Sequence, residues 1–222
     1  MLTEAEELFR FLKKRKKPSH SNSLTFQHLL VAQFNLQTRF LELIDREITN
    51  ARKGLPASIV IKLNNLEEKV MIAKLYEASR AGVNISLIVR GICCLVPGVE
   101  GMSENIKVIR IVDRYLEHGR IFIFHNNGRQ EVFMGSADWM DRNLYRRIEV
   151  CFPVYQKAMR DEIVQMINIQ LSDNAQAVQI DSKGNNIPVL ADPGQEIIQS
   201  QSAISAILTS DTKPHFVHDP IH

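Results

Sequence analysis

The sequence predicts an α/β fold in which a mixed, mostly parallel sheet is flanked by helices. A strand, a helix and a second strand follow one another between residues 58 and 90, and both strands are almost entirely apolar. Strands of this kind are buried on both faces, as in a parallel βαβ unit. Four further short apolar segments lie between residues 105 and 154. Strands and helices therefore alternate along the chain, as in α/β proteins.

The chain of 222 residues, 45% of them hydrophobic, is long enough to bury a core as one or two domains. No apolar run approaches the roughly eighteen residues of a membrane span, and acidic residues stand where a signal peptide has cations. We therefore expect no transmembrane segment and a cytoplasmic location. The net charge of +2 does not indicate a nucleic-acid partner. Cys93, Cys94 and Cys151 lack metal or redox spacing, which predicts reduced and mostly buried thiols.

The amino-terminal part begins with a predicted helix over residues 3–13, set apart from the rest by a basic stretch that contains Pro and Ser. Residues 26–33 predict a strand. Residues 37–54 predict a helix with one apolar face, because Phe40 and the residues three to four positions on are apolar. Basic residues followed by Gly54 are typical of a helix end.

The predicted βαβ unit and the later elements follow in order. The unit consists of a strand at 58–63, a helix at 66–82 and a strand at 84–90. A loop rich in Gly and Pro leads to four strands, within residues 105–112, 120–126, 131–136 and 146–154, and then to a helix at about 156–170. A small hairpin or strand and a closing helix are expected after it. The last residues, DTKPHFVHDPIH, have little to bury and are expected to be loose.

A candidate phosphate-handling site lies around YLEHGR and GSAD. His118 stands just before the strand at 120–126, and if that strand pairs with 131–136, Ser136 and Asp138 come to the same end of the sheet. A neutral histidine can attack phosphorus or pass a proton near neutral pH, and Arg120 offers forked donors to phosphate oxygens. Asp138 would repel a phosphate, so we expect it to orient His118 or an arginine.

Arg90 and two asparagines extend this candidate site. Arg90 ends an apolar strand directly before a glycine loop, which is where ligands bind in open α/β sheets. Asn64 and Asn65 are placed either to cap the next helix or to meet an anion at its positive end. The structural alternatives are ordinary caps for the asparagines and an ordinary hydrogen-bonded histidine at position 118.

The spacing H-x-R, strand, turn, strand, G-S-x-D resembles the H-x-K and G-S-x-N half-motif of the phospholipase D superfamily. Longer stretches together resemble polyphosphate kinases, namely KLNNL (62–66), LYEASRAGV (75–83), LIVRGICCLVPGVEG (87–101), IVDRYLEHGRIFIF (111–124) and GSADWMDRN (135–143). The resemblance covers about residues 26–180. One departure is arginine instead of lysine at position 120, which keeps the charge but changes the donor geometry.

The resemblance implies a phospholipase D-like fold and an activity that reversibly transfers the terminal phosphate of ATP to inorganic polyphosphate through a phosphohistidine, with Mg2+ assisting. It implies that Arg90 and His118 contact nucleotide or phosphate. In the mechanism that it implies, His118 and Arg120 take part in catalysis and Ser136 donates a further bond to phosphate. Asn65 is a predicted phosphate ligand because of its position before a helix. The partners implied are ATP, ADP, polyphosphate and the other domains of one enzyme, which we expect to be a homo-oligomer.

The same resemblance predicts three parts of the chain. Residues 1–25 would be a helix and linker from the end of a preceding domain, 26–180 a C-terminal phospholipase D-like catalytic domain, and 181–222 a C-terminal tail with a closing helix and loose end. The phosphohistidine and most magnesium contacts would lie in missing parts, so we predict that this fragment is inactive alone. Two alternatives stay open: a homodimeric phosphodiesterase of the phospholipase D type, and a non-catalytic module that binds polyanions.

Overall fold

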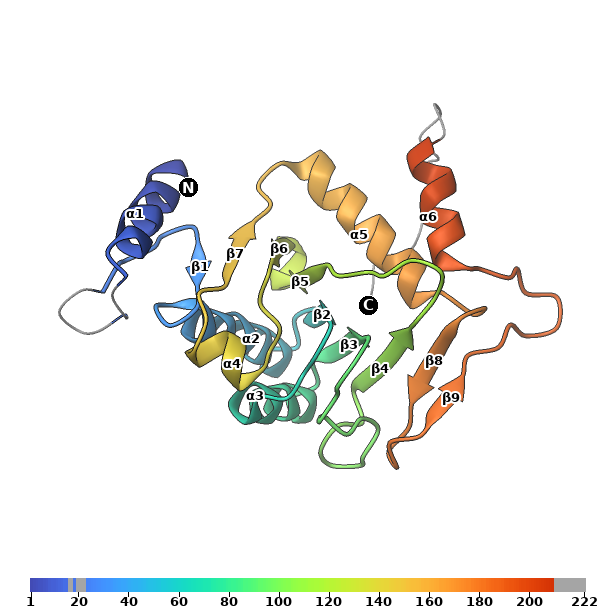
Figure 1. Cartoon of the computed structure of the whole chain (residues 1–222). Coiled ribbons are helices and arrows are strands. Elements are labelled where there is room, and N and C mark those ends of the chain that lie inside the picture. Colours follow the sequence, from blue (N-terminus) through green and yellow to red (C-terminus); the bar gives the residue numbers. More distant parts are fainter. Residues whose placement is uncertain (16–17, 19–22, 210–222) are drawn as a thin grey trace.

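The computed structural model describes residues 1–15, 18 and 23–209 (Figure 1). The predicted loose end at 211–222 lies outside these residues. The elements, in chain order, are α1 (Leu2–Lys13), β1 (Leu30–Val31), α2 (Leu36–Arg52), β2 (Ser58–Leu63), α3 (Lys69–Arg80), β3 (Asn84–Val89), β4 (Ile106–Ile111), β5 (Arg120–Phe124), the 3-10 helix η1 (Asn126–Gly128), β6 (Glu131–Gly135), α4 (Asp141–Tyr145), β7 (Val150–Pro153), α5 (Lys157–Leu171), β8 (Ala177–Ile180), β9 (Asn186–Pro188) and α6 (Ser200–Thr209).

The strands form one sheet in the order β1-β7-β6-β5-β2-β3-β4-β8-β9. In the described part of the chain, β2–β3 and β3–β4 are the parallel pairs, and the six other pairings are antiparallel. The α/β class and the mixed sheet are confirmed, but the expectation of a mostly parallel sheet is wrong. One reason is that no helix packs across the sheet between β5, β6 and β7, since residues 125–130 contain only η1 and residues 136–149 only the short α4, whereas parallel neighbours need a crossover connection.

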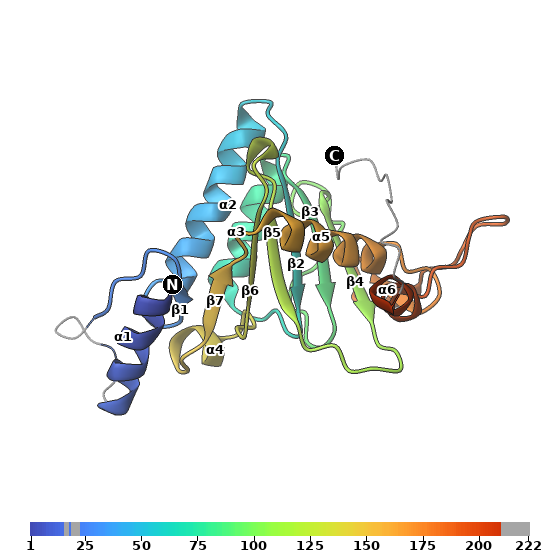
Figure 2. The same cartoon turned by 90° about the horizontal axis from the view of Figure 1, so that it is seen from above.

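Helices cover both faces of the sheet (Figure 2). On one face, α2 and α3 pack through Phe40, Ile44 and Leu75 onto one side of the central strands. On the other face, α5 packs through Ile167 against side chains such as Val60 of β2. Because successive residues of a strand point to opposite faces, β2 buries side chains on both sides. The apolar β2 predicted from the sequence is explained by this double cover.

The beginning of the chain differs from two expectations. Helix α1 is not set apart, since Leu8 packs with residues that follow the basic stretch, such as Phe26 and Leu29. The carboxylate of Glu4 also accepts hydrogen bonds from the backbone N–H groups of residues 27–29. The predicted strand at 26–33 is reduced to Leu30–Val31, because only these residues pair with β7.

The end of the described chain contains the predicted hairpin and helix. Strand β8 pairs with β4 and β9, so that the hairpin extends the sheet, and α6 lies beside α5 (Figure 1). The three cysteines are free, as expected, but only Cys151 is buried, whereas Cys93 is half-buried and Cys94 is exposed. The division of the chain at residues 25 and 180 stays a prediction.

Candidate active site

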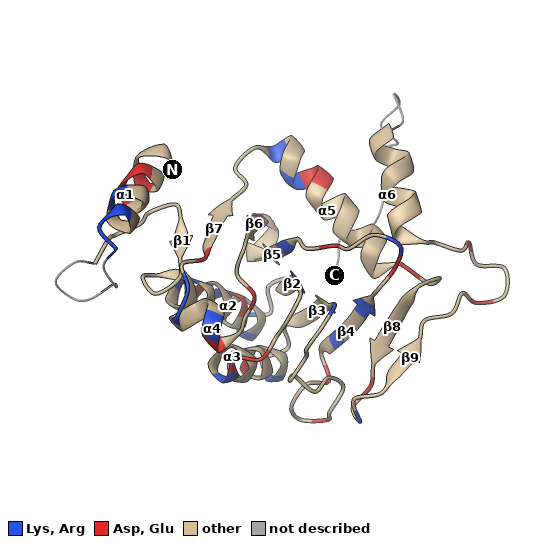
Figure 3. Cartoon of the chain, viewed as in Figure 1, with Lys and Arg blue, Asp and Glu red and all other residues tan. Residues whose placement is uncertain are grey.

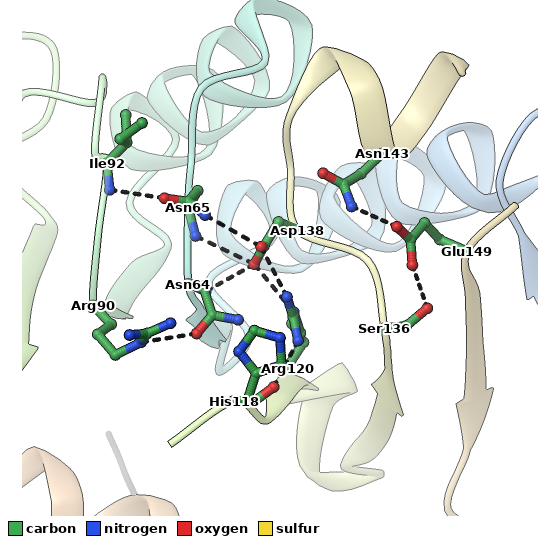
Figure 4. Close-up of polar contacts among 10 residues, drawn as sticks. All are labelled: Asn64, Asn65, Arg90, Ile92, His118, Arg120, Ser136, Asp138, Asn143 and Glu149. Carbon is green, nitrogen blue, oxygen red and sulfur yellow. Dashed lines mark hydrogen bonds and ion pairs between the residues drawn. The ribbon is translucent and has the colours of Figure 1, made fainter. Parts of the chain in front are cut away.

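The candidate residues meet at one edge of the sheet because of its strand directions. Strands β2 and β3 are parallel, so Asn64 and Arg90, which follow them, lie at the same edge. Strand β5 runs antiparallel to β2 and starts there, and β6 ends there, with Arg120 opposite Gly135. His118 and Asp138 are thereby brought beside Asn64 and Arg90 (Figure 4).

Asp138 lies at the centre of this cluster and is 3% exposed. Its Oδ1 accepts hydrogen bonds from the backbone N–H groups of Asn64 and Asn65, at 2.8 and 3.2 Å. Arg120 donates from Nε to Oδ1 at 3.2 Å and from Nη2 to Oδ2 at 3.0 Å. Burial alone would raise the pKa of Asp138, but the bonds from Arg120 and from the backbone of Asn64 outweigh it. The pKa of this carboxyl therefore lies below its ordinary value.

The Arg120 side chain donates its hydrogen bonds to other residues of the protein. Besides its two bonds to Asp138, its Nη1 donates to the carbonyl oxygen of His118 at 2.7 Å. The Arg120 side chain is 10% exposed. All three of its nitrogens therefore take part in fixing the start of β5 and the residue that carries the imidazole.

The Asn65 side chain also forms hydrogen bonds within the protein, and these connect the loop after β3 to the cluster. Its Oδ1 accepts from the backbone N–H of Ile92 at 3.0 Å, and its Nδ2 donates to Asp138 Oδ2 at 3.3 Å. A Cβ at Gly91 would come within 2.7 Å of Asn65 Oδ1, so the loop can approach only with glycine at that position. The asparagines do not cap α3, because Glu68 caps that helix by accepting from the backbone N–H of Met71.

Arg90 and His118 keep polar atoms available. Arg90 donates only its Nε, to Asn64 Oδ1 at 3.0 Å, and within the described residues its Nη1 and Nη2 have no hydrogen bond. His118 is exposed, and its imidazole likewise has no hydrogen bond to any described residue. Since Asp138 and Arg120 neutralise each other, the available charge of the cluster comes from Arg90. The arrangement presents a guanidinium fork and a titratable ring at one edge of the sheet.

Ser136 occupies a neighbouring position with other partners. Its hydroxyl donates to Oε2 of Glu149, while Asn143 Nδ2 donates to Oε1 of the same carboxylate at 2.6 Å. Ser136 Oγ also accepts from the backbone N–H of Val150 at 3.2 Å. Figure 4 shows this group beside the Asp138 cluster and not in it. Sequence reasoning missed Glu149, because only the pairing of β6 with β7 brings it next to Ser136.

The described residues do not supply a metal site. Within residues 1–15, 18 and 23–209, no three His, Cys, Asp or Glu side chains come together in a way that could hold a metal ion. Asp138, the carboxylate of the cluster in Figure 4, is already paired with Arg120 at 3.0 Å. The donor set of the site therefore does not fit a bound magnesium ion.

Residues 29–201 match the protein family described as polyphosphate kinase C-terminal domain 2. The chain belongs to this family. The polyphosphate kinase of Halalkalibacterium halodurans is 47% identical to this polyphosphate kinase domain over 182 residues, which are 82% of the chain and 26% of that relative. The chain thus spans about a quarter of the length of that curated relative.

Solved structures agree with this family. The crystal structure of the polyphosphate kinase from Porphyromonas gingivalis superposes with a TM-score of 0.86 at 46% identity, covering 92% of this chain and 31% of that one. Nuc from Salmonella typhimurium, a phospholipase D family member, superposes with a TM-score of 0.51 at 13% identity, covering 69% of this chain and 98% of that one. The phospholipase D-like fold of this polyphosphate kinase domain is confirmed. Among the described helices, none is both long and apolar enough to cross a membrane.

Proposed function

We propose that this domain belongs to an enzyme that reversibly transfers the terminal phosphate of ATP to inorganic polyphosphate, through a phosphohistidine carried on a preceding domain. The observation that carries the proposal is the convergence of Arg90 and His118 at one edge of the sheet, each with polar atoms that make no hydrogen bond to a described residue. The relatives named polyphosphate kinase support the same activity. In phosphoryl transfer the protein contributes mainly positioning and charge neutralisation.

Arg90 is the proposed phosphate ligand. Its Nε bond to Asn64 fixes the plane of the guanidinium and leaves the Nη1 and Nη2 side for a substrate. A planar fork of this kind binds two phosphate oxygens at once. ATP, ADP or the end of a polyphosphate chain would provide those oxygens.

His118 is the proposed proton carrier. An exposed imidazole that makes no hydrogen bond to the described residues can donate a proton to the departing oxygen or hydrogen-bond a phosphate, on the side opposite the phosphohistidine. The ion pair of Asp138 and Arg120 fixes the backbone of His118, since Arg120 donates a hydrogen bond to the His118 carbonyl oxygen. These contacts favour a supporting role for Arg120, Asn65 and Ser136, and not the phosphate contacts that the sequence predicted for them.

The rest of the proposal concerns the whole enzyme. Magnesium would be bound mainly by parts outside this chain. The preceding domain would supply the phosphohistidine and the enzyme would work in the cytoplasm as a homo-oligomer. For the 222-residue chain, we predict no acid-labile phosphate and no polyphosphate after incubation with magnesium and γ-labelled ATP, because the groups of one catalytic unit act together.

The test is His118→Ala in the full-length enzyme. Loss of general acid help should lower the rate of polyphosphate synthesis by on the order of a hundredfold or more. His125→Ala is the matched control, because His125 lies at the opposite end of β5, where its ring accepts from the backbone N–H of Gly128 at 3.2 Å. Circular dichroism should show an intact fold in both variants. Near wild-type turnover in correctly folded His118→Ala enzyme would remove His118 from the mechanism.

A further inference from the structure

The loop that carries His118 has no regular secondary structure. Residues 112–119 connect β4 to β5, and Tyr115 and Leu116 in this loop are 62% and 74% exposed. A cavity of about 610 Å³ lies between the loop and helices α5 and α6, and His118 lines it together with apolar residues such as Met166 and Ile204. Because of this cavity, close packing does not fix the loop on the side of the helices.

Polar side chains from three separate elements hold the loop instead, and they converge on Glu117. Lys62 of β2 forms an ion pair with its Oε2. Gln170 of α5 donates to the same oxygen at 2.6 Å, and Gln201 of α6 donates to Oε1 at 3.1 Å. Lys62 also donates to Gln170 Oε1 at 2.8 Å, so that the sheet and α5 are connected behind the loop.

Gln201 makes a second, paired contact with the loop. Its Oε1 accepts from the backbone N–H of Tyr115 at 2.9 Å, and its Nε2 donates to the Tyr115 carbonyl at 2.8 Å. Two residues earlier, directly before α6, the Gln199 side chain donates to Asp113 Oδ2 at 2.8 Å. Helix α6 contains no charged residue (Figure 3), so it contacts the loop through neutral amides and backbone.

The ion pair is costly to disturb. Lys62 is 8% exposed. Burial lowers the pKa of the Lys62 ammonium, with a smaller contribution in the same direction from the charge of Arg90, whereas Glu117 opposes this. A buried ammonium of this kind needs its carboxylate, and removal of one partner leaves an uncompensated charge. The geometry therefore keeps Glu117 in one place, directly beside His118 in the sequence.

We propose that Glu117 is a positioning residue for His118, and that α5 and α6 serve the site by holding Glu117 and the Tyr115 backbone through Gln170 and Gln201. The proposal rests on the proposed function, because it assumes that His118 takes part in phosphoryl transfer. According to this proposal, helix α6 stabilises the position of His118 although it contributes no charged group to the site.

The test uses Gln201→Glu in the full-length enzyme, because this change keeps the shape of the side chain. A carboxylate at this position would face the Tyr115 carbonyl and the Glu117 carboxylate, so two donated bonds become repulsions. Gln179→Glu is the control, since it makes the same change on the exposed side of β8. The readouts are hydrogen–deuterium exchange of residues 112–119 by mass spectrometry, and kcat and KM for polyphosphate synthesis.

The expected result for Gln201→Glu is faster exchange confined to the loop and a kcat at least tenfold lower, with KM for ATP changed much less. Gln179→Glu should match the wild type in both readouts. Glu117→Gln should lower kcat in the same way, because it removes the carboxylate that Lys62, Gln170 and Gln201 hold.

Two results would overturn the proposal even if the proposed function holds. Unchanged loop exchange in Gln201→Glu would show that the contacts do not hold the loop. Faster exchange with unchanged kcat, in an enzyme that His118→Ala inactivates, would show that holding the loop does not serve His118. If His118→Ala itself is active, the proposed function fails, and with it the positioning role. The exchange data then report separately that α6 holds the loop.

Discussion

Replacing Asp138 by asparagine should destabilise the domain strongly. The amide has the same shape as the carboxylate but only one acceptor oxygen, and its NH2 group would face donors. At present the carboxylate accepts bonds of 2.8–3.2 Å from Arg120 Nε, Arg120 Nη2 and the backbone of Asn64 and Asn65. The variant would leave the Arg120 guanidinium, 10% exposed, without its counter-charge.

The size of the effect follows from this burial. Removing one partner of a buried ion pair costs about 3–5 kcal/mol of unfolding free energy. That is a large share of the roughly 5–15 kcal/mol that stabilises a typical domain. For a chain of this length, each kcal/mol lowers Tm by about 2–4 °C, so the variant should melt about 6–20 °C lower.

The effect should also depend on pH. The pKa of Asp138 is lowered in the folded state, while an unfolded aspartate titrates near about 3.9. The stabilisation is therefore complete above the unfolded pKa and is lost as the pH falls through the folded pKa. The wild type and Asp138→Asn should accordingly differ most at neutral pH and converge in acid.

Urea unfolding followed by circular dichroism, at neutral pH and at about pH 3, measures this difference. Asp161→Asn is the control, because Asp161 pairs with Lys157 on the surface of α5, with side chains 57% and 80% exposed. Such a surface pair contributes about 0.3–0.5 kcal/mol. The reasoning would be refuted if Asp138→Asn lost no more than the control, or if its deficit stayed the same in acid.

Three further predictions concern substrate binding, packing and thiol chemistry. In the full-length enzyme, Arg90→Lys should lower kcat/KM for ATP by the equivalent of roughly 1–3 kcal/mol, because a lysine cannot form the fork; unchanged kinetics would make Arg90 structural. Gly135→Ala should cost about 1–3 kcal/mol in urea unfolding, since a Cβ there would collide with Cys151 Sγ, whereas Gly119→Ala, with nothing within 4 Å, should be close to neutral. Burial raises the pKa of Cys151 to about 12, so iodoacetamide at about pH 8 should label exposed Cys94 and spare Cys151 until urea is added, as mass spectrometry can show.

Much of the fold could be predicted from local patterns. The apolar segments at 58–63 and 84–90, with an amphipathic helix between them, define the βαβ unit because side-chain periodicity differs between strands and helices. The carboxyl ends of neighbouring parallel strands lie at the same edge of a sheet, so Arg90, after β3, could be placed beside Asn64, after β2. The residue types at that edge, with His118 before the next strand, led to the prediction of phosphate chemistry, which stays a prediction.

The pairing of the strands was decided only by tertiary structure. Local patterns do not state which strands become neighbours, and so they missed that six pairings of the described sheet are antiparallel and that β1 pairs with β7 through two residues. Helix α1 was expected to stand apart. Its contact through Glu4 with residues 27–29 was missed, because it joins segments that a basic stretch separates in the sequence. Contacts of this kind depend on the path of the chain in space.

The partners of the site residues were decided in the same way. The sequence determined that His118, Arg120 and Asp138 belong to one strand pair, because β5 and β6 are adjacent in the chain. It did not determine that Arg120 would donate hydrogen bonds to Asp138, or that Ser136 would donate one to Glu149. It also did not determine that side chains of α5 and α6 would donate to Glu117. Hydrogen bonds require distances near 3 Å and suitable angles. Residues from separate elements satisfy these conditions only once the sheet and its helices have packed.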